Sequence, residues 1–166
     1  DLEILKDTGT PLSHSPVANL KMATGILPAT DVLRAGVNLA LGTDGALNNN
    51  TYDMFAEMKA ACLLQNSSKR SARALRPEHA LEMATVNGAK AVGKTDLGSI
   101  EVGKEADIIL VDMMNPRTRP QHDIASNLVF SASASQVRHV SVAGKHVLKN
   151  YQLQGVSELE IMRKVD

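Results

Sequence analysis

The sequence has very few aromatic residues: two Tyr, two Phe and no Trp among 166 residues. A folded core must therefore be built from Ala, Val, Ile, Leu and Met, which bring the hydrophobic fraction to an ordinary 43%. A single cysteine, Cys62, excludes an internal disulfide. That usage is typical of a protein kept in a reducing compartment, so we expect the chain in the cytoplasm.

Neither sign of charge dominates, because 18 Lys and Arg residues are balanced by 18 Asp and Glu residues. The balance disfavours a nucleic-acid partner, and the basic segment at 69–76 is typical of a solvated loop. No apolar run approaches the ~20 residues that a membrane-spanning helix needs, and the first ten residues lack a signal-peptide pattern. We therefore expect neither a nucleic-acid nor a membrane partner.

Paired metal ligands are also missing, because the sequence has no His-x-His, His-x3-His or Cys-x2-Cys motif. A catalytic zinc ion takes about three protein ligands. This sequence offers at most two in one place. A complete metal site within these 166 residues is therefore not expected.

The first part of the sequence alternates strand and helix signals. Short strands are predicted at 10–14 and 37–41, with a helix over 28–35 between them, which is the size of one βαβ unit. A longer helix is predicted over 51–65, with possible N-caps in the Asn run at 48–50. A further helix is predicted to begin at Pro77, with an apolar stripe that continues towards Val92. Residues 2–6 are predicted to be the end of a helix, and Gly9 terminates it.

After a boundary near 94–103 the pattern becomes mostly β. Strands are predicted at 108–111 and 127–130, and 137–148 contains two strand-like halves around an Ala-Gly turn. A short helix is predicted over 157–165, with Ser157 as its cap and Glu160 as the capping-box partner. The fold class is therefore α/β.

Three polar residues follow or end the first two predicted strands. Asp44 follows the strand at 37–41 in the sequence LGTDG, His14 ends the strand at 10–14, and Asn19 comes shortly after it. Parallel strands present their carboxyl ends at one edge, where active sites collect. Asp44 suits a metal ligand or general base, but a turn-forming or helix-capping Asp is common at such corners, and the local pattern alone slightly favours that interpretation. His14 and Asn19 could line a pocket or only hydrogen-bond their loops.

Three segments together resemble the amidohydrolase superfamily. They are SHSPVANLKMATGILP at 13–28, GVNLALGTDGALNNNTYDMFAEMKAACLLQ at 36–65 and LGSIEVGKEADIILVD at 97–112. The closest likeness is to the chlorohydrolase and aminohydrolase branch, which includes 5-methylthioadenosine/S-adenosylhomocysteine deaminases, guanine deaminases and triazine hydrolases. The likeness extends over essentially the whole chain. Each segment alone would be unspecific.

The resemblance implies a metal-dependent (β/α)8 barrel with a small β-sandwich, and hydrolytic deamination of an amino-heterocycle such as a purine nucleoside. In that family one divalent ion, Zn or Fe, polarises a water molecule. Asp44 matches the Asp of the eighth strand, which binds the metal and takes the proton of the water. His14 and Asn19 match a seventh-strand motif that lines the substrate pocket.

The family's other metal ligands and its proton-shuttling Glu have no counterpart here. They are expected before residue 1, because a full barrel takes ~250 residues. We therefore expect the C-terminal portion of a hydrolase that is inactive alone. By itself it should be unstable, or it should associate with its own copies or with a complementary N-terminal half. Residues 1–96 would be the last two barrel units, 97–156 a β-sandwich segment and 157–166 a C-terminal tail.

Two other interpretations stay open at this point. The chain could be a non-catalytic binding or interaction module that keeps the family pattern. It could also be an ordinary small α/β protein in which Asp44 only forms a turn.

Overall fold

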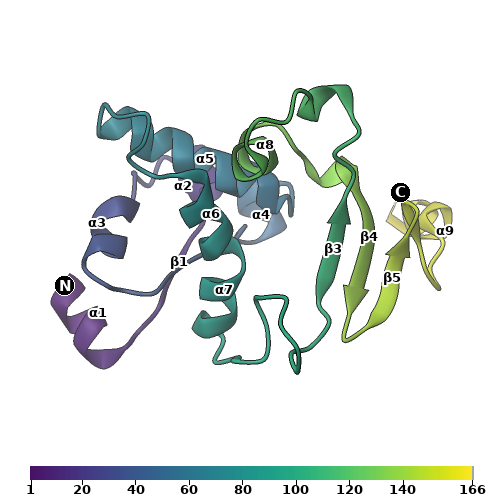
Figure 1. Cartoon of the computed structure of the whole chain (residues 1–166), viewed down its shortest axis with the longest axis horizontal. Helices are drawn as coiled ribbons and strands as arrows, with labels where there is room; N and C mark the ends of the chain where they lie inside the picture. The colour runs from purple at the N-terminus through teal and green to yellow at the C-terminus, as the bar shows by residue number, and fades with distance from the viewer. Residues whose placement is uncertain (166) are drawn as a thin grey trace.

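The computed structural model describes residues 1–165 and contains two separate sheets (Figure 1). A parallel pair is formed by β1 (Leu12–His14) and β2 (Leu39–Leu41). An antiparallel sheet has the order β3-β4-β5-β6. Its strands are β3 (Ile108–Val111), β4 (Val137–Val142), β5 (Lys145–Lys149) and β6 (Gln152–Leu153). The predicted α/β class is confirmed.

Helices surround the parallel pair at the purple-to-teal end of Figure 1. They are α1 (Leu2–Thr8), α2 (Pro16–Lys21), α3 (Ala29–Arg34), α4 (Ala46–Asn49), α5 (Met54–Ser68), α6 (Pro77–Ala84) and α7 (Val86–Ala91). The predicted strand, helix, strand unit is confirmed, because β1 runs through α2 and α3 into a parallel β2. Gly9 ends α1 in the left-handed conformation, as the sequence predicts.

The cap of α5 differs from the prediction. Asp53 caps this helix, and its side chain accepts hydrogen bonds from the N–H groups of Phe55 and Ala56. The Asn run at 48–50 instead belongs to α4 and to its left-handed C-cap, Asn50. An ionised Asp oxygen suits the N-terminal N–H groups of a helix, so the later cap is physically reasonable.

The helix predicted to continue from Pro77 to Val92 is broken at Thr85 into α6 and α7. The Thr85 hydroxyl donates to the carbonyl oxygen of Leu81 at 2.7 Å. Beyond the break, Asn87 Nδ2 donates to Leu39 O in β2, and the backbone carbonyl of Asn87 accepts from Nδ2 of Asn38, the residue before β2. These two hydrogen bonds hold α7 against β2.

The predicted strand at 127–130 is wrong, because these residues end helix α8 (Ile124–Phe130). The Asp123 side chain caps this helix by accepting from Ser126 N–H. Val129 is fully buried, and α8 packs on α5 and α6. The Asp123 cap and the burial of Val129 outweigh the preference of Val129 and Phe130 for a strand, because local propensity contributes less free energy than burial does.

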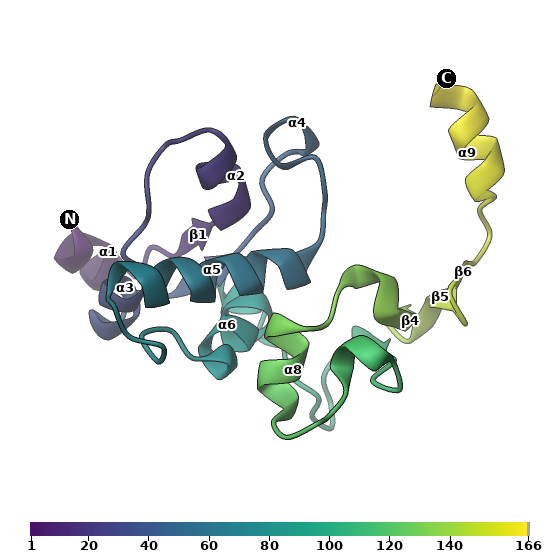
Figure 2. The same cartoon turned by 90° about the horizontal axis from the view of Figure 1, so that it is seen from above.

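The predicted C-terminal helix and its Ser157 cap are confirmed, but within residues 1–165 the Glu160 side chain does not accept a bond from Ser157 N–H, so the predicted capping box is incomplete. Helix α9 (Glu158–Val165) begins after Ser157, whose hydroxyl accepts from Glu160 N–H. Figure 2 shows it standing away from the rest of the molecule. No helix within residues 1–165 combines the length and the apolarity needed to cross a bilayer.

The main core lies between the parallel pair and helices α5, α6 and α8. All three residues of β2 are buried, as expected of a strand covered on both faces. The core is aliphatic, with Phe55 as its one buried aromatic side chain among the described residues. Cys62 lies in this core with no exposed surface, and burial raises the pKa of its thiol to about 11, with Glu78 adding to the effect.

We predict that Cys62 is inert in the folded chain. A thiol with this pKa stays protonated at mildly alkaline pH, and the thiolate is the reactive form. A chromogenic thiol reagent should react far more slowly with the native chain than with the urea-unfolded chain. Equal rates would contradict the buried position of Cys62.

Candidate functional site

The carboxyl ends of β1 and β2 meet at one edge of the parallel pair. His14 pairs with Leu41 in the strand register, and Gly42 N–H donates to His14 O at 2.9 Å, which extends the ladder by one residue. Asp44 follows two residues later. The structure therefore brings His14 and Asp44 to the same edge, as the sequence predicts, while their chemical roles stay predictions.

His14 is buried and carries an unused ring nitrogen. Its side chain is 2% exposed, and within residues 1–165 no group hydrogen-bonds to its Nε2. Burial lowers the pKa of His14, while the Asn19 side chain beside it acts in the opposite direction. Burial therefore favours the neutral form of the imidazole. A buried polar atom without a partner is uncommon and suits a group that binds a ligand.

Asp44 is exposed and has a left-handed backbone, with a φ of 61°. Its Oδ1 accepts from Gly45 N–H at 2.7 Å and its Oδ2 from Asn48 Nδ2 at 3.0 Å. Asp tolerates this conformation better than most residues, and the two bonds hold the carboxylate in one orientation. Each oxygen keeps a further lone pair, so the group is able to bind a cation or accept a proton.

Asn19 lies on α2 and donates from Nδ2 to Thr24 Oγ1 at 3.0 Å. This bond fixes the segment that follows α2. Asn19 also lies beside the ring of His14. In this structure it therefore holds its own loop and faces the candidate pocket residue at the same time.

Sequence reasoning missed a buried pair behind this edge, Glu57 and Asn49. Glu57 is 1% exposed on α5, and its carboxylate accepts from Val17 N–H and from Asn49 Nδ2. Burial raises the pKa of Glu57, and the bonds from Val17 and Asn49 oppose that rise. The available signal was a Glu between Phe55 and Met58, inside the apolar face of the helix.

The donors at this edge could form only part of a metal site. Within residues 1–165 no three His, Cys, Asp or Glu side chains gather closely enough to hold an ion. The carboxylate of Asp44 and the free Nε2 of His14 are donor types that zinc and iron accept. His139 and His146 lie in the antiparallel sheet, with ring centroids 6.2 Å apart.

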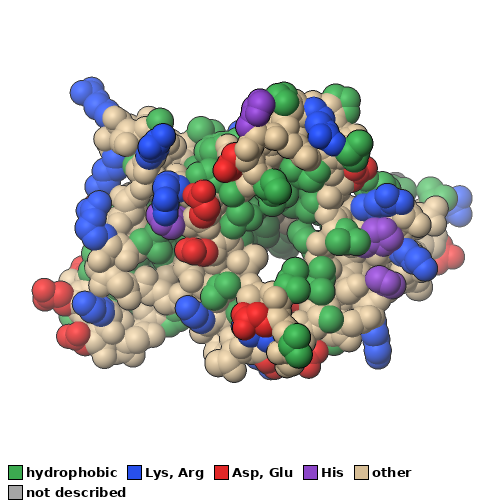
Figure 3. Space-filling model, in the orientation of Figure 1, with side chains coloured by type: hydrophobic (Ala, Val, Ile, Leu, Met, Phe, Trp, Pro, Cys, Tyr) green, Lys and Arg blue, Asp and Glu red, His purple; other side chains and the backbone are tan. Residues whose placement is uncertain are grey.

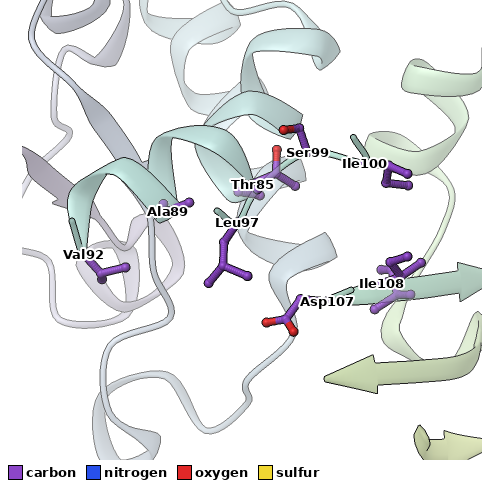
Figure 4. Close-up of a pocket in the computed structure, with 12 residues that line it drawn as sticks. Thr85, Ala89, Val92, Leu97, Ser99, Ile100, Asp107 and Ile108 are labelled. Atoms are coloured by element: carbon purple, nitrogen blue, oxygen red, sulfur yellow. The ribbon is translucent and has the colours of Figure 1, made fainter. Parts of the chain in front are cut away.

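A hollow of about 440 Å³ lies elsewhere, between α7 and the start of β3. Figure 4 shows Ala89 and Val92 on one side of it and Asp107 and Ile108 on the other. Hydrophobic side chains gather around the gap between the helices and the antiparallel sheet in Figure 3. None of the residues that line it is His14, Asn19 or Asp44, so it is distinct from the edge described above.

Comparison with known families and proteins gives a consistent result. A model described as the amidohydrolase family matches residues 1–147. A 5'-deoxyadenosine deaminase of Methanosarcina mazei is 43% identical over 99% of this chain, and a 5-methylthioadenosine/S-adenosylhomocysteine deaminase of Pelotomaculum thermopropionicum is 43% identical over 98% of it. The chain spans only 38% and 37% of these two curated relatives.

Solved structures agree with this likeness. A crystal structure of a zinc-bound adenosine deaminase from Xanthomonas campestris matches 98% of the chain with a TM-score of 0.95 and 39% identity. The zinc complex of atrazine chlorohydrolase from Arthrobacter aurescens matches with a TM-score of 0.90 at 24% identity, which supports the fold alone. The chain covers 37% of each of these chains.

We predict that the stability of the chain falls as the pH drops below the ordinary histidine pKa of ~6.5. Because the pKa of His14 is lowered in the folded state, the unfolded state binds the proton at a higher pH. The contribution of His14 to the free energy of unfolding is therefore complete above pH ~6.5 and is lost as the pH falls towards the folded-state pKa. Urea midpoints measured across this range should fall with pH. The His14→Gln variant should give a flatter curve, and an identical slope in both proteins would contradict the assignment.

Proposed function

The chain belongs to the amidohydrolase family, and on that premise we propose that it is the C-terminal portion of a metal-dependent aminohydrolase that deaminates a purine nucleoside or a related amino-heterocycle. The observation that carries the proposal is the placement of Asp44 and of the unpartnered His14 Nε2 at one edge of the parallel pair. Relatives named as adenosine-type deaminases support the substrate class.

Asp44 would hold the divalent ion, zinc or iron, together with ligands outside this chain. When bound, such an ion supplies Lewis-acid activation of a water molecule. The Asp44 carboxylate would accept the proton of the attacking water and return it to the departing amino group, which leaves as ammonia. The bonds from Gly45 and Asn48 keep this carboxylate oriented while the proton moves.

His14 would contact the heterocycle through Nε2, because that atom is buried and no group within residues 1–165 hydrogen-bonds to it. A neutral imidazole can stabilise charge that develops on the ring without a cost for its own desolvation. Asn19, which lies beside the imidazole, would complete this side of the substrate pocket.

The proposed organisation assigns residues 1–96 to the last two barrel units, 97–156 to a β-sandwich segment and 157–166 to the tail, of which residue 166 lies outside the described residues. Exposed apolar side chains such as Ile109 and Leu110 on β3 suit contact with a complementary N-terminal half or a further copy. The chain alone would then be inactive. A single buried thiol fits action in the cytoplasm.

The test uses the complete protein that carries this chain, assayed with adenosine, 5'-deoxyadenosine and 5-methylthioadenosine. We expect ammonia release that requires the metal and that Asp44→Asn lowers by about 10²–10⁴-fold, because the amide is a poor proton acceptor. Asn also tolerates a left-handed backbone, so the fold should be retained. Unchanged rate and metal content in Asp44→Asn would remove Asp44 from this role. A stable complete protein with no turnover would favour a non-catalytic binding module.

A further inference from the structure

Glu57 is an acidic residue placed where an apolar one would be expected. Its neighbours on α5, Phe55 and Met58, belong to the core, and Glu57 itself is 1% exposed. The ion pairs within residues 1–165 do not involve it. A buried carboxylate without a counter-ion is unfavourable unless hydrogen bonds compensate it, so its bonds to neighbouring segments matter.

Those bonds reach both loops that carry the candidate site. Oε2 of Glu57 accepts from Val17 N–H at 3.1 Å, three residues after His14. Oε1 accepts from Asn49 Nδ2 at 2.6 Å, and the same Nδ2 donates to Thr43 O at 2.6 Å, directly before Asp44. The carboxylate therefore joins the segment after β1 to the segment after β2. Figure 2 shows α2 and α4 on the same side of α5.

The arrangement requires a group that only accepts hydrogen bonds. A Gln side chain at position 57 would turn one of its ends into a donor that faces either Val17 N–H or the amide of Asn49. If Asn49 rotated its amide to accept that donor, its oxygen would face the carbonyl oxygen of Thr43. No orientation of the two amides satisfies every contact.

Asp44 depends on such support more than an ordinary residue does. Its left-handed backbone is sparsely populated for residues other than glycine and persists only where the surroundings hold it. The Asn49 bond to Thr43 O holds the residue before it, and the bond from Asn48 holds the Asp44 side chain. A loosened Asn49 would let Asp44 change both position and orientation.

We propose that Glu57 is a positioning residue that clamps the two loops through Val17 and Asn49, and so fixes Asp44 relative to His14. The proposal rests on the proposed function for its effect on catalysis. Its structural part, the coupling of the two loops, stands independently of any activity.

The test compares Glu57→Gln with Gln65→Met in the complete protein. Gln65 is an equally buried polar residue on α5, but its bonds go to Leu27 O and Thr30, away from the candidate site. We expect Glu57→Gln to lower metal affinity or kcat by about 10–100-fold, which is typical of residues that orient a metal ligand. Gln65→Met should lose thermal stability yet keep its metal affinity and kcat. Equal kinetic effects in the two variants would overturn the proposal.

A second readout separates this proposal from the proposed function. In NMR spectra of the complete protein, Glu57→Gln should shift the amide resonances of both His14 and Asp44, whereas Gln65→Met should leave them in place. If these shifts are observed in a protein that has no deaminase activity, the coupling of the two loops by Glu57 is supported and the proposed function is rejected. If Glu57→Gln does not fold, Asn49→Ala breaks the same link from the other loop, and unshifted His14 resonances in that variant would overturn the proposal.

Discussion

The parallel pairing of β1 with β2 is the constraint on which the rest of the candidate site depends. Its register sets His14 beside Leu41, and the added bond from Gly42 N–H to His14 O continues the pairing to the point where the chain turns. A Cβ atom at Gly42 would approach Ser13 Oγ to 2.9 Å, so a side chain there would require the Ser13 hydroxyl to turn away. Two strands of three residues each are thus enough to bring the segments after β1 and β2 to the same edge of the parallel pair.

Polar groups behind this edge hold it in shape. Glu57, Asn49 and Thr43 form one buried chain of hydrogen bonds, while Lys21 Nζ bonds Leu47 O and Asn50 Oδ1 at the surface. Both sets connect α2 to α4, which follow β1 and β2 respectively. His14 and Asp44 differ sharply in burial although they share this frame, so one is suited to a dry contact and the other to a cation or a proton.

The helical part and the antiparallel part are joined by polar bonds and by Val111 and Val137, which pack against the main core. Asp53 caps α5 with one oxygen and accepts from Ala134 N–H with the other, at the start of the short helix Ala134–Gln136. Lys59 Nζ donates to Phe130 O at the end of α8. Below these contacts the hollow between α7 and β3 is lined mostly by apolar groups, which suits it to further packing rather than to polar chemistry.

Local pattern in the sequence was enough to place β1, β2, α5 and the antiparallel strands β3, β4 and β5, but not β6, and to put His14 and Asp44 at strand ends. These features depend on periodicity, on glycine stops and on turn residues, which act over a few neighbours. Only the tertiary structure decided that 127–130 is helical, because the docking of Val129 on α5 and α6 is a long-range contact. The same holds for Glu57, whose burial becomes tolerable only when Val17, 40 residues earlier in the chain, lies against it.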